Sequence, residues 1–131
     1  MSKILIIEDD PLMQRMYQKA FSFDKYEVSV AGDGVEGLDK VRAEKPTVVL
    51  LDVMMPKMNG LETLVKIKSD PEIKSIPVIM LTNLAGSADA EKALESGAVK
   101  YIVKSEQEPK EVVKMVKEII AGYTRDAIPS K

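Results

Sequence analysis

Three carboxylates stand directly after two runs of apolar residues. Residues 4–7 are followed by Glu8 and Asp9, and residues 48–51 are followed by Asp52. Short apolar runs rich in β-branched residues are typical of strands buried on both faces of a parallel sheet. Because the carboxyl ends of such strands meet at one edge, where open α/β sheets bind ligands, we expect the three side chains to lie together.

Two further polar side chains follow predicted strands. Thr82 ends the apolar run 77–81, and Lys104 follows the run 99–103. Each group also has an ordinary structural interpretation: helix capping for the acids, a strand-end hydroxyl for Thr82 and a solvated ammonium for Lys104. Polar groups that follow four different strands at the same edge favour one shared site over separate coincidences.

The residue types that are missing restrict the chemistry of this site. The chain has no histidine and no cysteine, which excludes Ser-His-Asp and Cys-His nucleophiles, Cys/His zinc sites and disulfides. Three clustered carboxylates repel one another unless cations compensate, and an all-oxygen ligand set selects magnesium or manganese. With a divalent ion and Lys104 present, the cluster could accept a phosphoryl group that one carboxylate attacks.

Strands and helices alternate along the whole chain. Pro11 is expected at the first position of a helix capped by Asp10, an edge-like strand is expected at 26–30, and Gly122 is the expected end of the last helix. This pattern predicts an α/β fold, a doubly wound five-stranded parallel sheet of (βα)5 type with helices on both faces. The helix positions predicted to carry the apolar faces are Met13, Met16, Tyr17, Ala20, Phe21, Val35, Leu38, Val41, Leu61, Leu64, Val65, Leu94, Val112, Val113, Val116, Ile119 and Ile120.

Length and charge limit the further possibilities. The chain has 131 residues, enough for one domain with its own core, which we place at 1–122 with a short tail at 123–131. The net charge of −2 argues against general affinity for nucleic acid. No apolar run approaches the length needed to span a membrane, so we expect a cytoplasmic protein with neither nucleic-acid nor membrane partners.

Four motifs carry a resemblance to a known family. They are IIEDDP at 6–11, LLDVMMPKMNG at 50–60, MLT at 80–82 and YIVK at 101–104. Together they resemble the response-regulator receiver domain of two-component signalling, the family of the chemotaxis receiver. The resemblance covers nearly the whole chain and implies a flavodoxin-like fold with the strand order 2-1-3-4-5.

The resemblance implies roles in phosphoryl transfer for four residues. Asp52 would be the phosphoacceptor, and Lys104 would contact both the phosphoryl group and the Asp52 carboxylate. Thr82 would move to hydrogen-bond a phosphoryl oxygen, and Tyr101 would swing inward behind it as part of the switch.

The resemblance also implies a Mg²⁺ site, at which Mn²⁺ could substitute. Asp9 and Asp52 would be direct ligands, Met54 would contribute its main-chain carbonyl, and Glu8 would act through water in the outer shell. Asp10 is interpreted mainly as a helix cap, because Pro11 follows it directly.

The implied function is that of a response regulator rather than an enzyme with an external substrate. A histidine kinase or a histidine phosphotransfer protein would supply the phosphoryl group. The surface formed by residues 85–96, 99–103 and the last helix would then bind a partner protein, unless the group is passed on. No output domain follows, so we expect a stand-alone receiver, monomeric or weakly dimeric on phosphorylation. The alternative is a receiver-fold interaction module that works independently of phosphorylation.

The sequence departs from the family pattern at three places. Ser105 follows Lys104 where the family commonly has a proline in a cis peptide, so either a strained cis bond of about 3 kcal/mol is present or the loop differs. Asn83 replaces a small residue and could narrow access to Asp52. Leu84 and the Met54 side chain are apolar and could not orient an attacking water, which predicts slow loss of the phosphoryl group.

Two rival functions also fit an α/β sheet with an aspartate at its edge. A haloacid-dehalogenase-like phosphatase typically has a second acid two residues after its nucleophile, where this chain has Met54, and it needs a substrate cap that the length excludes. A flavodoxin-like FMN binder needs a phosphate-cradling loop after the first strand, where residues 8–10 are acidic and would repel phosphate.

Overall fold

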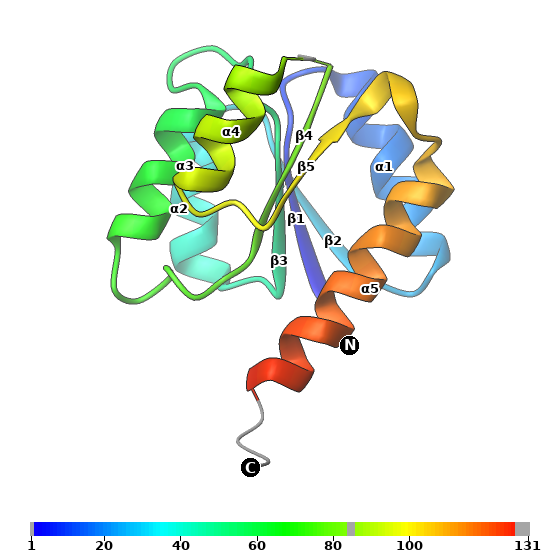
Figure 1. The fold of residues 1–131 in the computed structure, drawn as a ribbon. Coiled ribbons are helices and arrows are strands. Elements are labelled where there is room, and N and C mark those ends of the chain that lie inside the picture. The colour runs from blue at the N-terminus through cyan, green and yellow to red at the C-terminus, as the bar shows by residue number, and fades with distance from the viewer. Residues whose placement is uncertain (1, 84–85, 128–131) are drawn as a thin grey trace.

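Five parallel strands form the sheet of the computed structural model, which describes residues 2–83 and 86–127. The strand order β2-β1-β3-β4-β5 confirms the predicted fold class. The strands are β1 (Lys3–Ile7), β2 (Glu27–Ala31), β3 (Val48–Leu51), β4 (Val78–Thr82) and β5 (Lys100–Val103). Helices cover both faces of the sheet (Figure 1), so that the three central strands are buried as their apolar sequences predicted.

The helices alternate with the strands along the chain. They are α1 (Pro11–Phe23), α2 (Gly34–Glu44), α3 (Gly60–Ser69), α4 (Ser87–Glu95) and α5 (Pro109–Ala127), and a short 3-10 turn, η1 (Lys104–Glu106), follows β5. Helices α1 and α5 pack on one face of the sheet, and α2, α3 and α4 pack on the other (Figure 1). Each face has its own layer of buried side chains, as in other doubly wound sheets.

The register of the strands brings their carboxyl ends to one level. Ile7 pairs with Ala31 on one side and with Leu51 on the other, and Leu51 pairs with Met80. The backbone N–H of Asp52 then donates to the carbonyl of Ile7 at 3.1 Å. The residues that follow β1 and β3 therefore emerge side by side at the same edge.

The start of α1 is as the sequence predicts. Pro11 occupies the first turn, and the Asp10 carboxylate accepts a hydrogen bond from the Leu12 N–H at 2.9 Å. This bond satisfies one of the donors that a helix N-terminus leaves unpaired. The interpretation of Asp10 as a helix cap is confirmed.

Several predicted apolar contacts are wrong. Val35, Val65 and Leu94 are about half exposed, at 47%, 50% and 48%. In α4 it is Ala93, fully buried, that faces the sheet. In α2 the other two predicted positions, Leu38 and Val41, are buried, so only Val35 is misplaced on a helix whose orientation is as predicted. Neighbouring positions in a short apolar segment give similar helical patterns, which is why the wrong neighbour was chosen.

The predicted end of the last helix is also wrong. Helix α5 continues through Gly122 to Ala127, and its final part projects beyond the sheet (Figure 1). Glycine disfavours a helix interior by only about 1 kcal/mol, so it does not end a helix whose preceding turns are held by packing. Val112 and Val116 provide that packing, since both are fully buried.

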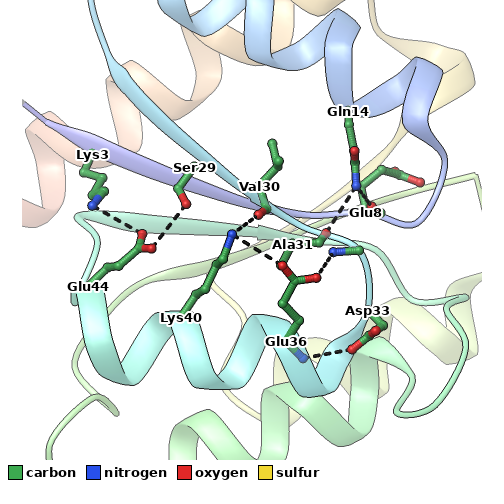
Figure 2. A network of polar contacts seen from close by, with 11 residues as sticks. Lys3, Glu8, Gln14, Ser29, Val30, Ala31, Asp33, Glu36, Lys40 and Glu44 are labelled. Atoms are coloured by element: carbon green, nitrogen blue, oxygen red, sulfur yellow. Dashed lines mark hydrogen bonds and ion pairs between the residues drawn. The ribbon is translucent and has the colours of Figure 1, made fainter.

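The exposed edge of β2 is covered by side chains of α2. The Ala31 carbonyl faces β1, where it accepts from the Glu8 N–H at 2.9 Å, so the preceding carbonyl, that of Val30, faces the open side of the sheet. The Lys40 ammonium donates to this Val30 carbonyl and pairs with Glu36 at 3.4 Å (Figure 2). One carbonyl on the open edge is thus satisfied within the chain.

In the ranges 2–83 and 86–127, no helix is long and apolar enough to cross a lipid bilayer.

Candidate functional site

The predicted site is a cleft of about 390 Å³ at the carboxyl edge of the sheet. The structure brings six of the seven predicted site residues into its lining, while Tyr101 is half-buried on β5 and packs against the core on the α3 and α4 side. The lining residues are Glu8, Asp9, Asp10, Met13, Asp52, Met54, Thr82, Asn83 and Lys104. Residues from four strand ends thus form one site.

The three predicted acids lie close together. Each of Glu8, Asp9 and Asp52 offers a carboxylate oxygen within 4.8 Å of those of the other two. Glu8 and Asp52 are buried, with 4% and 8% of their surface exposed, whereas Asp9 is exposed. Burial and mutual repulsion destabilise these three negative charges unless cations lie close to them.

Lys104 supplies one of these cations. Its ammonium, 7% exposed, forms an ion pair with the Glu8 carboxylate and lies 3.4 Å from the Asp52 Oδ2. The residue directly follows β5, so the strand end aims the side chain across the edge of the sheet. The lysine therefore holds two carboxylates that come from β1 and β3.

The Glu8 carboxyl group is affected by opposing influences. Burial raises the pKa of Glu8 above its ordinary value, while the hydrogen bond from Lys104 and the one from the Asp10 N–H, at 3.1 Å, lower it. The result is a raised pKa, because removal from water outweighs the contacts that stabilise the anion.

One oxygen at the centre of the site is unsatisfied. Asp52 Oδ1 is buried and has no hydrogen-bond partner among the described residues, although Oδ2 of the same carboxylate accepts from Lys104. A buried carboxylate oxygen without a partner is costly and calls for a cation or a donor. Together with the neighbouring acids it fits a hard divalent ion, because Mg²⁺ and Mn²⁺ prefer oxygen ligands.

Close backbone contact fixes the position of the Asp52 segment. A Cβ atom on Gly60, at the start of α3, would lie only 2.0 Å from the Asp52 carbonyl oxygen. Asn59 caps the same helix in a reciprocal capping box with Glu62. Glycine is therefore required at position 60 so that the first turn of α3 can pack directly against the backbone of Asp52.

The loop after β5 takes a trans form. No cis peptide bond occurs among the described residues, and Lys104 instead begins the 3-10 turn η1, which continues through Ser105 to Glu106. The sequence left two possibilities at Ser105, a strained cis peptide or a loop that differs from the family pattern. The structure has the second. Asn83 is exposed and lines the cleft as expected, and Leu84 lies outside the described residues.

Two residues near the site were not predicted from the sequence. Met13 lines the cleft, and the Gln14 side chain donates to the main-chain carbonyl of Glu8 (Figure 2). Gln14 follows Asp10 by four residues, so both lie on the same side of α1 near the loop. That spacing was the available signal, but a glutamine on a helix is usually solvated and gives no distinctive pattern.

Comparison with known proteins identifies similar chains. The profile of the family described as "Response regulator receiver domain" matches residues 4–117. The chain is 38% identical over 103 residues to the response regulator PleD of Caulobacter vibrioides, covering 79% of this chain and 23% of PleD. It is 36% identical over 115 residues to the DNA-binding response regulator MtrA of Mycolicibacterium smegmatis, covering 88% of this chain and 49% of MtrA. The chain thus spans less than half the length of these two relatives.

Solved structures give the same result. A CheY-like response regulator receiver domain protein from Methanospirillum hungatei JF-1 superposes with a TM-score of 0.89 at 28% identity, covering 97% of this chain and 99% of the other. The Mn²⁺-bound form of the response regulator Rcp1 superposes with a TM-score of 0.77 at 30% identity, covering 91% of each chain.

Proposed function

This chain belongs to the family of response regulator receiver domains, and on that basis we propose that Asp52 accepts a phosphoryl group in a reaction that depends on magnesium. One observation carries the proposal. A buried Asp52 carboxylate has one oxygen paired with Lys104 and the other without a protein partner, beside two further acids. In such an arrangement the carboxylate can act as a nucleophile, because one oxygen is held by a lysine and the other is available to a cation or an electrophile.

Each acid has a proposed role at the metal site. Asp9 and Asp52 are the direct ligands, the Met54 main-chain carbonyl is a third, and Glu8 acts through water. Magnesium, when bound, would supply positive charge that the phosphoryl oxygens need as they approach three carboxylates. Manganese is the expected substitute, because it prefers the same oxygen ligands.

The side chains then carry out the transfer. An Asp52 carboxylate oxygen attacks the phosphorus atom in line with the leaving group, and as the O–P bond forms the bond from phosphorus to the donor breaks (P–N in a phosphohistidine, P–O in acetyl phosphate), so that the donor leaves with that electron pair. The Lys104 ammonium holds a phosphoryl oxygen and keeps the acceptor oriented. The Thr82 hydroxyl donates to another phosphoryl oxygen, and Tyr101 turns inward behind it. The surface of α4, β5 and α5 changes as a result and binds a partner protein, unless the group is passed on.

The phosphoryl donor comes from another protein. The chain has no histidine, so a phosphohistidine must be supplied by a sensor histidine kinase or by a histidine phosphotransfer protein. We propose that the receiver is a phosphoacceptor and not an enzyme acting on other substrates. We further propose that it works in the cytoplasm without direct contact with nucleic acid or membrane, as a monomer or as a weak dimer after phosphorylation.

Loss of the phosphoryl group is proposed to be slow. The Met54 side chain lines the cleft beside Asp52 and is apolar, so it offers no acceptor that could orient an attacking water. Hydrolysis requires a water held in line with the phosphorus atom. We therefore expect an aspartyl-phosphate lifetime of minutes or longer.

Intact-mass measurement after incubation with acetyl phosphate tests the proposal. The expected result is a gain of one phosphoryl group that requires both magnesium and Asp52, and is absent in Asp52→Ala. Asp39→Ala is a matched control, because Asp39 is an acid on α2 outside the cleft lining. No gain from acetyl phosphate or from a phosphorylated histidine kinase would contradict the proposal and favour the phosphorylation-independent interaction module.

A further inference from the structure

Gln14 joins the ends of two strands next to residues 8–10, the segment that carries Glu8 and Asp9. Its side-chain amide nitrogen donates to the Glu8 carbonyl and lies 3.5 Å from the Ala31 carbonyl (Figure 2). Glu8 follows β1 and Ala31 ends β2, so a side chain from α1 bridges the carboxyl ends of two neighbouring strands. A primary amide has two N–H donors, which is the number that two carbonyls require.

The geometry of α1 directs Gln14 toward the loop. Its backbone N–H donates to the Asp10 carbonyl at 2.9 Å, which places it one helical turn after the cap. Long side chains on a helix lean back toward the N-terminus. Gln14 therefore reaches back over the segment that contains the acids rather than outward into solvent.

The carbonyl that Gln14 holds belongs to the peptide that joins Glu8 to Asp9. Two other hydrogen bonds already restrain this segment: the Glu8 N–H donates to Ala31 at 2.9 Å, and the Asp10 N–H donates to the Glu8 carboxylate at 3.1 Å. Gln14 adds the restraint on the peptide plane itself. Since Asp9 is exposed, solvent rather than packed side chains surrounds it, and its direction depends on the backbone that carries it.

We propose that Gln14 is a positioning residue for the metal site, which fixes the Glu8–Asp9 peptide so that both carboxylates point into the cleft. This inference rests on the proposed function, since it concerns the same ion. Groups that orient metal ligands without touching the metal typically change metal affinity 10- to 100-fold when they are removed. Gln14 acts through main-chain orientation, so we expect an effect at the lower end of that range.

Gln14→Met is the variant that tests the proposal, because it keeps the length of the side chain and removes the amide without adding charge. Gln18→Met is the matched control: Gln18 lies one turn further along α1 and donates none of the hydrogen bonds described above. Mg²⁺ binding is measured by isothermal titration calorimetry, and Mn²⁺ binding by electron paramagnetic resonance. We expect about tenfold weaker binding for Gln14→Met and unchanged binding for Gln18→Met.

A purely structural role would give a different result. Urea unfolding in EDTA reports stability without metal, and Gln14→Asn, whose amide is one methylene shorter, provides a second variant in case Gln14→Met folds poorly. If both variants lose stability in EDTA yet bind Mg²⁺ as tightly as the unmodified protein, the positioning role is overturned. If the unmodified protein itself binds no divalent ion, it is the proposed function that fails. A weakened Mg²⁺ affinity with phosphorylation restored at saturating magnesium supports the inference.

Discussion

Removal of Lys104 provides the strongest test of the electrostatics of the site. In Lys104→Met the buried ammonium is lost, and the carboxylates of Glu8 and Asp52 remain buried without it. At the 3.4 Å separation from Asp52, the attraction at an effective dielectric constant of about 20 is roughly 5 kcal/mol before desolvation is counted. Breaking one partner out of a buried ion pair typically costs about 3–5 kcal/mol, so we expect the metal-free protein to lose about 3 kcal/mol.

Urea unfolding in EDTA at neutral pH measures this loss. Lys100→Met is the control, because Lys100 is an exposed lysine on the same strand and should change the free energy of unfolding by less than about 0.5 kcal/mol. The double variant Lys104→Met with Asp52→Asn should recover at least about 1 kcal/mol, since one of the two carboxylates left without Lys104 is then neutral. Magnesium should stabilise Lys104→Met more than it stabilises the unmodified protein.

The effect of pH on Lys104→Met follows from the same contacts. Burial already raises the pKa of Glu8, and Lys104 opposes that rise, so its removal should raise the pKa further. A raised carboxyl pKa means that the folded state binds protons more readily than the unfolded state, and its stability then improves as the pH falls. The stability gap to the unmodified protein should therefore narrow on acidification. The reasoning would be refuted if Lys104→Met lost no more free energy of unfolding than Lys100→Met. It would also be refuted if adding Asp52→Asn left the loss in Lys104→Met unchanged.

Three further predictions concern other parts of the fold. Gly60→Ala should destabilise the protein by about 2–4 kcal/mol in urea unfolding, because the added Cβ would overlap the Asp52 carbonyl. The pKa of Asp70 is lowered by the hydrogen bond from the Glu72 N–H and by the contact with Arg42. The Asp70 carboxylate therefore stabilises the fold above the ordinary Asp pKa, and this stabilisation is lost in acid. Asp70→Asn should accordingly lose less stability than the unmodified protein as the pH falls from about 5 to 3. Leu94→Ala should change the unfolding free energy by less than about 1 kcal/mol, since Leu94 is half exposed.

Each of these three has a comparison that can contradict it. For Gly60 the comparison is Gly122→Ala, which should stabilise α5 by about 0.5–1 kcal/mol because no atom lies within 4 Å of the added Cβ. If Gly60→Ala and Gly122→Ala changed the free energy of unfolding in the same direction, the packing described at Gly60 would be contradicted. For Asp70, acid-unfolding curves that run parallel would show that its carboxylate has the same pKa in both states. For α4, a loss of more than 2 kcal/mol in Leu94→Ala would mean that Leu94 and not Ala93 packs inward.

The strands and the site were largely predictable, because their signals are strong and short. The apolar runs before Glu8, Asp52 and Thr82 could be buried only as central strands, and parallel strands bring their ends to one edge. The cleft positions of Glu8, Asp9, Asp52, Thr82 and Lys104, which follow strands, were therefore predictable from their places in the sequence, whereas that of Met13 on α1 was not. The motif resemblance to receiver domains, now confirmed by the family match, supplied the strand order that periodicity could not give.

The errors came from weaker or longer-range information. Val35, Val65 and Leu94 were predicted to face inward because a short apolar segment does not show which of two neighbouring helix positions is buried. Successive residues on a helix differ in direction by 100°, so choosing the wrong neighbour turns the predicted side chain away from the core. Gly122 was taken as an end because its local propensity was weighed without the packing of the preceding turns. Gln14 was not predicted because its partner is the main-chain carbonyl of Glu8. Every residue has such a carbonyl, so the contact is not reflected in the residue types.

The contact between Lys40 and the Val30 carbonyl has a consequence for how the molecules behave at high concentration. An open strand edge is a template on which a strand of another molecule can add, and growth of that kind leads to fibrous aggregation. On β2 such a strand would have to displace the Lys40 ammonium from the carbonyl and bring its own backbone alongside Glu36. The Lys40 side chain of α2 therefore opposes growth of the sheet between molecules through the β2 edge, besides its part in the fold of a single molecule.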